Sequence, residues 1–291
     1  MYKLKYTLGS HEKAVSAVSF SPCGKFVASA SADRIIHIYS TETGNLKKAL
    51  DGRYRQGLND IIWLKQDTDN IKDSNYLAVC SDDRSITIWD LTAEKIIQSF
   101  FGHKGFVFCV TQTTRLCHGL LLSGSYDGTA RLWDIRRNLS VAAFDAHSEP
   151  VHDIDCSPTR DHFITSGGDG IFRTWDLTNQ QCLRTHVLNA SPPVPATTVS
   201  FVPSGLHALI GALDSRLRLW DLYTDDTASD VTGADAPSPV VRQYKDNNYT
   251  NTKFCCSSKF TYINEKWLKD SNYHSIYNKT QTHNNNNNEK D

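Results

Sequence analysis

The sequence has no apolar run that could cross a membrane and no excess of charge of either sign. A membrane-spanning helix needs about 20 consecutive apolar residues, and no stretch approaches that length. The 291 residues include 31 Lys and Arg against 32 Asp and Glu, a formal net charge of −1. This balance argues against a polybasic nucleic-acid-binding protein and against an acidic disordered tail. We expect no membrane partner and no direct nucleic-acid partner.

Signals for secretion and for disulfide pairing are also missing. The first six residues alternate like a strand and lack the apolar core of a signal peptide. The eight cysteines include no C-x-x-C pair, and most lie in apolar, strand-like runs, where a thiol acts as a small hydrophobic group. We therefore expect reduced cysteines and an intracellular protein.

Motifs of enzymatic chemistry are absent as well. The sequence contains no G-x-S-x-G, H-E-x-x-H, phosphate-binding P-loop or G-x-G-x-x-G pattern. One glycine-rich stretch, residues 166–170, falls on a repeated turn, and no helix follows it to bind phosphate. We expect no catalytic residues, no metal site, no cofactor and no enzymatic activity.

What the sequence does contain is an internal repeat. Trp89, Trp133, Trp175 and Trp220 are each followed by Asp and lie 44, 42 and 45 residues apart. Tyr39 takes the same place in an earlier copy. An aspartate stands six residues before each of these aromatic residues: Asp33, Asp83, Asp127, Asp169 and Asp214. A period of about 40–45 residues that ends in Trp-Asp is typical of β-propeller blades with four strands each.

The residues within one copy agree with a four-stranded meander. In the first copy, residues 14–20, 25–31, 34–39 and 46–50 read as strands, and turn-forming residues separate them. No long stretch shows the 3.6-residue period of a helix. The sequence therefore predicts an all-β protein whose blades cover one another's faces around an axis.

Three histidines precede the repeated aspartates by 22 to 24 residues: His11, His103 and His147. Because each falls in a different blade, they do not converge on one catalytic or metal site. We interpret each as the partner of its own aspartate, in a buried hydrogen bond that joins strand to turn. Arg53 takes this place in the second copy, and residues 189–193 take it in the fifth.

These motifs resemble those of the WD-repeat family, whose pattern is Gly-His followed by Asp-x5-Trp-Asp. Within that family the sequence is most similar to the scaffold subunits of histone H3 lysine-4 methyltransferase complexes. The stretches that carry this resemblance are residues 13–16, 31–33, 107–109, 146–151, 169–176, 213–221 and, more weakly, 253–267.

The resemblance implies a site at the mouth of the propeller channel, where an arginine of a partner peptide inserts between two phenyl rings. Phe108 matches one ring, Cys255 a wall of the tunnel, and Asp82 the acidic group at its mouth. The small residues beside the peptide are Ala14, Ser16 and Ala32, and the aromatic residues of the rim are Tyr126 and Phe254. A planar, weakly hydrated guanidinium suits such a slot better than an ammonium group does.

The sequence departs from the family's site at several positions. Ser257 stands where the second ring would be, so that side of the slot is open. Asn59, His152 and Gly168 replace serine, serine and tyrosine. The resemblance also implies a second face for an acidic, hydrophobic peptide, made by Leu219, Phe260 and Tyr262, with Ser204 and His207 at its polar positions.

The C-terminal part does not complete a ring of seven blades. Residues 1–222 form five firm blades, residues 223–268 read as an insertion and a degenerate sixth blade, and no seventh follows. Residues 269–291 form an Asn-rich tail that we expect to be disordered. Residues 2–8 are suited to supply the last blade's outer strand. Three outcomes stay open: a shortened product with an open ring, closure with fewer blades, and completion by another chain.

We therefore predict a non-enzymatic scaffold, a monomer within a complex. By resemblance, its partners are methyltransferase complex components and the histone H3 tail. We expect it in the nucleus, with the cytoplasm as an alternative or additional location, and we expect no secretion. The alternatives are a generic WD-repeat adaptor of a ubiquitin ligase or splicing complex, and a truncated product with impaired function.

Overall fold

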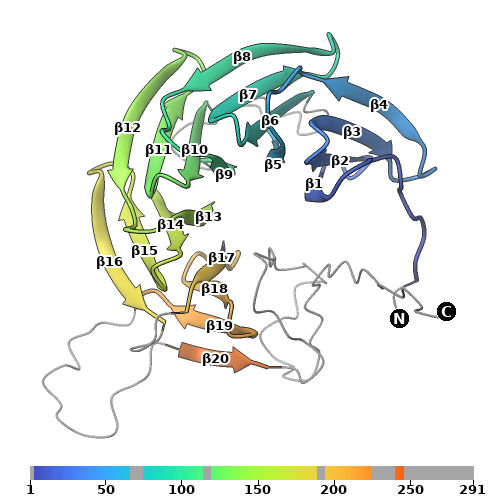
Figure 1. Cartoon of the computed structure of the whole chain (residues 1–291). Coiled ribbons are helices and arrows are strands. Elements are labelled where there is room, and N and C mark those ends of the chain that lie inside the picture. The colour runs from blue at the N-terminus through green and yellow to red at the C-terminus, as the bar shows by residue number, and fades with distance from the viewer. Residues whose placement is uncertain (1–2, 66–74, 114–118, 189–193, 224–239, 246–291) are drawn as a thin grey trace, which may run out of the picture.

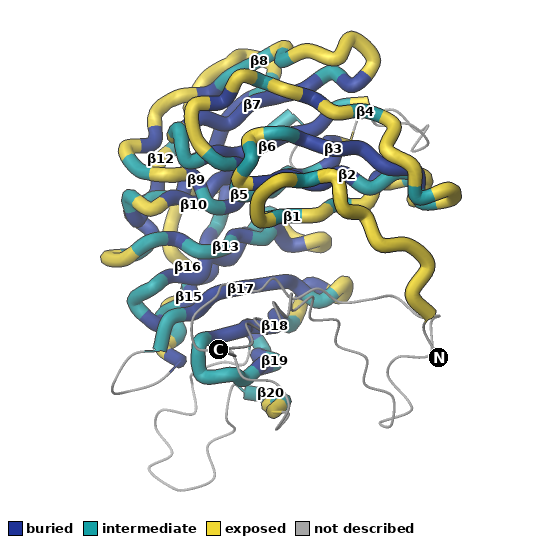
Figure 2. Tube along the Cα trace, turned by 45° about the vertical axis from the view of Figure 1, so that its right-hand side comes forward, coloured by how far each residue is buried: buried dark blue, intermediate teal, exposed yellow. Residues whose placement is uncertain are grey.

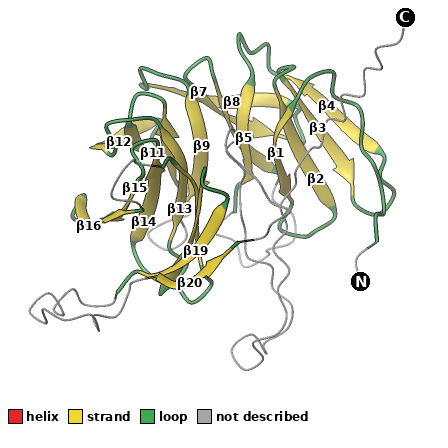
Figure 3. Cartoon of the chain, turned by 60° about the horizontal axis from the view of Figure 1, so that its bottom comes forward, coloured by secondary structure: helices red, strands yellow, loops and turns green. Residues whose placement is uncertain are grey.

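The computed structural model describes residues 3–65, 75–113, 119–188, 194–223 and 240–245, and this part of the chain is built from β-strands and loops. Twenty strands form five sheets of four, and no helix occurs among the described residues. Figure 3 shows that loops alone connect the strands. The prediction of an all-β propeller is confirmed.

The strands follow the repeat, four to a blade. The first blade holds β1 (Val15–Phe20), β2 (Phe26–Ser31), β3 (Ile35–Ser40) and β4 (Leu46–Asp51). The second holds β5 (Leu58–Trp63), β6 (Tyr76–Ser81), β7 (Ser85–Asp90) and β8 (Lys95–Phe101). The third holds β9 (Val107–Gln112), β10 (Leu120–Ser125), β11 (Thr129–Asp134) and β12 (Leu139–Asp145). The fourth holds β13 (Val151–Cys156), β14 (His162–Gly167), β15 (Ile171–Asp176) and β16 (Gln181–Val187). The fifth holds β17 (Ala196–Phe201), β18 (His207–Ala212), β19 (Arg216–Asp221) and β20 (Val240–Tyr244).

Each blade is an antiparallel meander in chain order, and the blades stand side by side along an arc (Figure 1). The first strands of successive blades line the inside of the arc: β1 packs on β5, β5 on β9, β9 on β13 and β13 on β17. Figure 2 shows burial concentrated in the middle strands of the blades, whereas the outer strands β4, β8 and β12 and the first strand β1 consist mostly of exposed or half-buried residues. The core therefore lies between blades.

The repeated aromatic residues occupy one register position in every blade. Tyr39, Trp89, Trp133, Trp175 and Trp220 each lie in the third strand opposite an apolar residue of the second strand. All five are buried. Trp89 belongs to a cluster that contains Ile38 of the first blade, so the repeated aromatic residue stabilises the junction with the preceding blade.

Every inner strand also carries a β-bulge at the same place. One residue has no partner on the second strand: Ser16, Asn59, Phe108, His152 and Thr197. A bulge re-aims the side chain of the extra residue. We call these five the bulge residues.

The expected His–Asp hydrogen bonds are present in three blades. Nδ1 of His11, His103 and His147 lies 2.8, 3.2 and 2.9 Å from Asp33, Asp127 and Asp169. In the third blade the chain of bonds continues from His103 Nε2 to Ser123 Oγ, which also accepts from the Trp133 indole at 2.8 Å. These histidines hold strand to turn within separate blades.

In the second blade, Tyr54 supplies the buried hydrogen bonds that the histidine provides in other blades. It lies one residue after Arg53, which takes the histidine's place in the repeat. Its hydroxyl accepts a hydrogen bond from Trp89 Nε1 at 2.7 Å and lies 2.5 Å from Thr87 Oγ1. In the fifth blade, Arg218 pairs with Asp214. The stretch at residues 189–193 lies outside the described residues.

The structure differs from our expectations at both ends of the arc. The fifth sheet takes its outer strand, β20, from beyond residue 222, which is the predicted end of the five-blade segment. The expected N-terminal strand is not formed in residues 3–8: Lys5 donates to Thr41 O at 3.1 Å, and Tyr6 hydrogen-bonds Glu42 O. The degenerate sixth blade and the Asn-rich tail lie outside the described residues.

The first blade lacks a described neighbour on one face. Val18 and Phe20 are 40% and 66% exposed. The residues at the position of Val18 in the other blades are at most 3% exposed: Ile61, Val110, Ile154 and Val199. This face ends the arc in the part of the chain that the structure describes.

Candidate functional site

The strongest candidate site lies where the inner strands begin. In each blade a backbone hydrogen bond of 2.8–3.1 Å joins the residue before the repeated aspartate to the residue two before the bulge residue. Together with the bulge residues, these define the inner rim. Its members are Ala14, Ser16 and Ala32; Gly57, Asn59 and Asp82; Phe106, Phe108 and Tyr126; Pro150, His152 and Gly168; and Pro195, Thr197 and Leu213.

At three of the four blade junctions, the bulge residue hydrogen-bonds the first residue of the next inner strand. Ser16 Oγ donates to Leu58 O at 2.5 Å, and Asn59 Nδ2 donates to Val107 O at 2.8 Å. His152 Nδ1 lies 2.9 Å from Ala196 O. Because a carbonyl only accepts, the Nδ1 of this imidazole carries the hydrogen.

The third blade breaks this pattern because Phe108 has no donor. Its half-buried ring instead meets Tyr126 edge-on, with the centroids 6.0 Å apart, and lies 6.5 Å from the His152 ring. Phe106 lies 5.9 Å from Tyr126. Tyr126 is 57% exposed and Phe106 44%. The inner rim therefore carries an aromatic cluster, Phe106, Phe108, Tyr126 and His152, open to solvent at the third and fourth blades.

An acidic group lies next to this cluster. Asn59 donates to Asp82 Oδ1 at 2.7 Å with the same amide group that bonds Val107 O. Asp82 is therefore linked, through one side chain, to the strand that carries Phe108. The carboxylate keeps further lone pairs for a cationic partner.

The structure places all six described members of the expected peptide site on the inner rim. Ala14, Ser16 and Ala32 are exposed small residues of the first blade, and Asp82 follows in the second. Phe108 and Tyr126 come together in the third. Phe254 and Cys255, together with Ser257, lie outside the described residues.

The sequence alone did not point to Phe106, nor to the contacts of His152 with Ala196 O and the Phe108 ring. Phe106 lies two residues before Phe108, and both rings contact the ring of Tyr126. That spacing was the available signal for Phe106. No comparable signal existed for the His152 contact, which joins two different blades.

The expected second face is only partly described. Leu219 is half-buried in β19, opposite Leu209 and Arg242. Ser204 is exposed, and His207 begins β18. Phe260 and Tyr262 lie outside the described residues.

Burial raises the pKa of the Cys80 and Cys109 thiols well above the ordinary value, and neither of these two cysteines forms a disulfide. The described segments contain no cluster of three His, Cys, Asp or Glu residues suited to a metal ion. They also contain no helix of the length and apolarity that a bilayer requires.

Comparison with known families agrees with this geometry. The family described as "WD domain, G-beta repeat" matches residues 2–40, 67–90, 94–134, 138–176 and 179–221, more than half of the chain. The chain belongs to the WD-repeat family. WD-repeat proteins are generally non-enzymatic interaction scaffolds.

Individual relatives of this WD-repeat protein have varied names. Nuclear distribution protein PAC1 of Arthroderma otae is 26% identical over 75% of this chain and 52% of its own length. COMPASS component SWD3 of Saccharomyces cerevisiae is 26% identical over 71% of this chain and 64% of its own length. WD repeat-containing protein 44 of Xenopus laevis is 27% identical over 73% of this chain and 24% of its own length. The chain thus spans only part of each relative, and the particular closeness to methyltransferase scaffolds is not specific.

Proposed function

We propose that this WD-repeat protein is a scaffold that binds an arginine-bearing peptide of another protein at its inner rim. The observation that carries the proposal is the open aromatic cluster of the third blade, next to Asp82. At the other three junctions the side chain of the bulge residue hydrogen-bonds the next blade. The side chain of Phe108 makes no such hydrogen bond, so its ring can contact a ligand.

The chemistry of the cluster favours arginine. A guanidinium group is planar and weakly hydrated, so it stacks on an aromatic face more readily than a lysine ammonium does. Such a contact contributes about 0.5–2 kcal/mol, and more as water is excluded. Asp82 adds an acceptor that orients the cation. The small side chains of Ala14 and Ala32, which belong to the same inner rim, leave room for the peptide backbone.

The assembly to which the scaffold belongs is a further part of the proposal. We propose methyltransferase complex components and the histone H3 tail as partners, and the nucleus as location. The relative described as a COMPASS component supports a role within a complex. Relatives described as nuclear distribution proteins support a generic adaptor to the same degree. Copurification separates the two, because each proposal names a different set of partner subunits.

Calorimetry with an arginine-bearing H3 peptide tests the site. We expect Phe108→Ala to weaken binding about tenfold, the loss of 1–2 kcal/mol. Replacing the arginine of the peptide by lysine has a similar effect. Phe101→Ala is the matched control, because Phe101 is 72% exposed on the outer strand β8, away from the inner rim. Equal affinities of the wild type and Phe108→Ala would contradict the proposal.

A further inference from the structure

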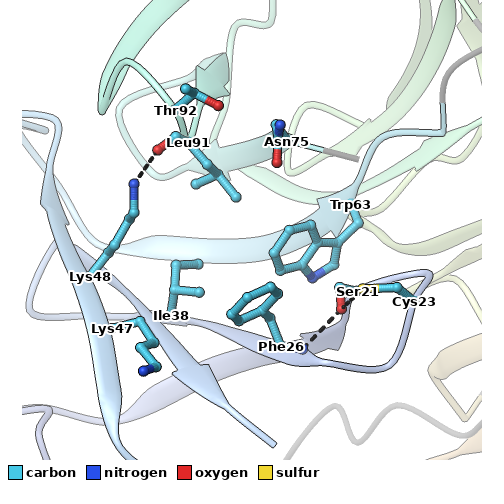
Figure 4. A pocket seen from close by; sticks show the side chains of 10 residues that line it. All are labelled: Ser21, Cys23, Phe26, Ile38, Lys47, Lys48, Trp63, Asn75, Leu91 and Thr92. Atoms are coloured by element: carbon cyan, nitrogen blue, oxygen red, sulfur yellow. Dashed lines mark hydrogen bonds between the residues drawn. The ribbon is translucent and has the colours of Figure 1, made fainter. Parts of the chain in front are cut away.

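A second candidate site lies in the cleft between the first and second blades, away from the inner rim (Figure 4). It is a cavity of about 250 Å³. Its floor is apolar: Ile38 is 3% exposed, and Trp63 and Leu91 are each 7% exposed. An apolar cavity of about 150 Å³ holds a benzene ring. This one is therefore large enough for an aromatic side chain.

The edge of the cavity is polar and carries one unpaired cation. Lys48 is engaged, since its ammonium donates to Leu91 O and pairs with Glu94 Oε1 at 2.8 Å. Gln98 makes the equivalent bond to Ile135 O at the next junction, so Lys48 has a structural role. Lys47 is exposed and forms no ion pair with any described residue. Thr92 is exposed on the opposite blade.

The chain itself shows which group fits such a cleft. At the junction of the fourth and fifth blades, Tyr223 takes the place that Thr92 has here, directly after the Trp-Asp-Leu phrase. Its hydroxyl lies 3.1 Å from His162 Nδ1, and the Arg160 guanidinium lies 4.0 Å from its ring centroid. His162 corresponds in register to Phe26, which lines the cavity. A tyrosine ring therefore occupies at one junction the place that a threonine leaves open at the other.

We propose that this cleft binds a partner protein through an aromatic side chain of that partner, with an acidic residue beside it. The ring packs on Phe26, Trp63 and Leu91, as Tyr223 packs in its own junction. The acidic residue pairs with Lys47. The cleft and the inner rim are separate, so one chain holds two partner segments at once.

The probe is the dipeptide N-acetyl-aspartyl-tyrosinamide, added to the full chain and followed by NMR through the indole signal of Trp63. We expect a saturable shift with a dissociation constant on the order of 1 mM, as befits a ligand of this size. N-acetyl-aspartyl-alaninamide is expected to give no such shift. Absence of a saturable Trp63 shift up to about 10 mM of the tyrosine probe overturns the proposal.

A matched pair of variants sharpens the test. Thr92→Tyr places a tyrosine where Tyr223 stands in its own junction, so we expect it to weaken the probe at least tenfold (about 1.4 kcal/mol) and to raise the thermal midpoint by a few degrees. Thr178→Tyr is the control, because Thr178 is an exposed threonine at the same repeat position in another junction. If Thr92→Tyr and Thr178→Tyr bind the probe equally well, the cleft is not its site.

A third variant stands independently of those two. Lys47→Glu is a surface change that keeps the cavity, and we expect it to weaken the aspartyl probe about three- to tenfold while N-acetyl-tyrosinamide binds as before. An unchanged affinity for the aspartyl probe contradicts the acidic part of the proposal. Binding of arginine peptides at the inner rim is unaffected by any of these variants, so the two sites are tested separately.

Discussion

The side-chain amide of Asn59 donates a hydrogen bond to Asp82 across 2.7 Å and another to Val107 O across 2.8 Å. One side chain thus holds the acidic group of the inner rim against the strand of Phe108. The acid and the aromatic ring come from different blades, and Asn59 fixes their relative position.

Replacing Asp82 by asparagine separates its charge from its hydrogen bond. Asp82→Asn still accepts from Asn59, so we expect little change in the free energy of unfolding. The affinity for an arginine peptide falls about three- to tenfold, and the loss shrinks at high salt because the interaction is electrostatic. Calorimetry at two salt concentrations measures this. Asp145→Asn, an exposed change on β12, is the control, and an equal loss there contradicts the role of Asp82.

Because one face of the first blade is exposed, we expect Val→Ala to change the free energy of unfolding by different amounts at three equivalent positions of the repeat. Val110→Ala and Val199→Ala remove buried methyl groups, so each lowers the free energy of unfolding by about 2 kcal/mol. Val18→Ala, at a 40% exposed position, lowers it by less than about 0.5 kcal/mol. Urea denaturation measures all three. An equal loss for Val18→Ala would show that this face is covered in solution.

Acid should destabilise the blades through their paired aspartates. Burial alone would raise the pKa of Asp33, Asp127 and Asp169, but hydrogen bonds from the histidines and from backbone N–H groups outweigh it and lower each pKa below the ordinary 3.8. The unfolded chain takes up protons first as the pH falls. The stabilisation is therefore present above the ordinary pKa and is lost as the pH falls from there through the lowered pKa values.

The free energy of unfolding, measured from pH 7 down to about pH 3, tests this. We expect it to fall with acid and to fall less steeply in Asp127→Asn, which starts about 1–3 kcal/mol less stable. A slope that is identical in Asp127→Asn and the wild type would mean that this pair does not set the acid sensitivity.

The hydroxyl of Tyr54 carries a separate prediction. Tyr54→Phe leaves the Trp89 indole without its buried acceptor, so we expect a loss of about 1–3 kcal/mol in stability. Burial raises the pKa of Tyr54 to about 12, so its phenol titrates later than an exposed one in an alkaline absorbance titration. Tyr126→Phe is the control for stability, since Tyr126 is 57% exposed. If both variants are equally stable, Tyr54 is not the brace of the second blade.

Much of the fold followed from the repeat, because the Asp-to-Trp interval covers the same turn and third strand in every blade. The four strands of the first blade came within a residue or two of their observed ends. The prediction of an N-terminal strand was wrong for a physical reason. Alternation of apolar residues shows which face of a strand would be buried, but a strand forms only where a partner strand is available for hydrogen bonding. Residues 3–8 instead bond the turn between β3 and β4.

The site was less accessible from sequence than the fold. Phe108 and Tyr126 were predicted, and the structure brings them together on the inner rim. Tyr54 was missed because it lies one residue after the position of the repeated histidine and binds the Trp89 indole directly, whereas His103 is connected to Trp133 through Ser123. The contacts of Asn59 and His152 join different blades, and no spacing along the chain encodes them.

In each blade the bulge residue can either hydrogen-bond the next blade or contact a bound peptide, but one side chain does not do both. A hydrogen-bond donor there joins its blade to the next, as Ser16, Asn59 and His152 do. The half-buried ring of Phe108 packs in the aromatic cluster instead, and its junction lacks this hydrogen bond. Placing a phenylalanine at the bulge position of another blade would therefore move the binding surface along the arc. It would also remove a hydrogen bond between two other blades, so each new binding specificity would lower the rigidity of the scaffold.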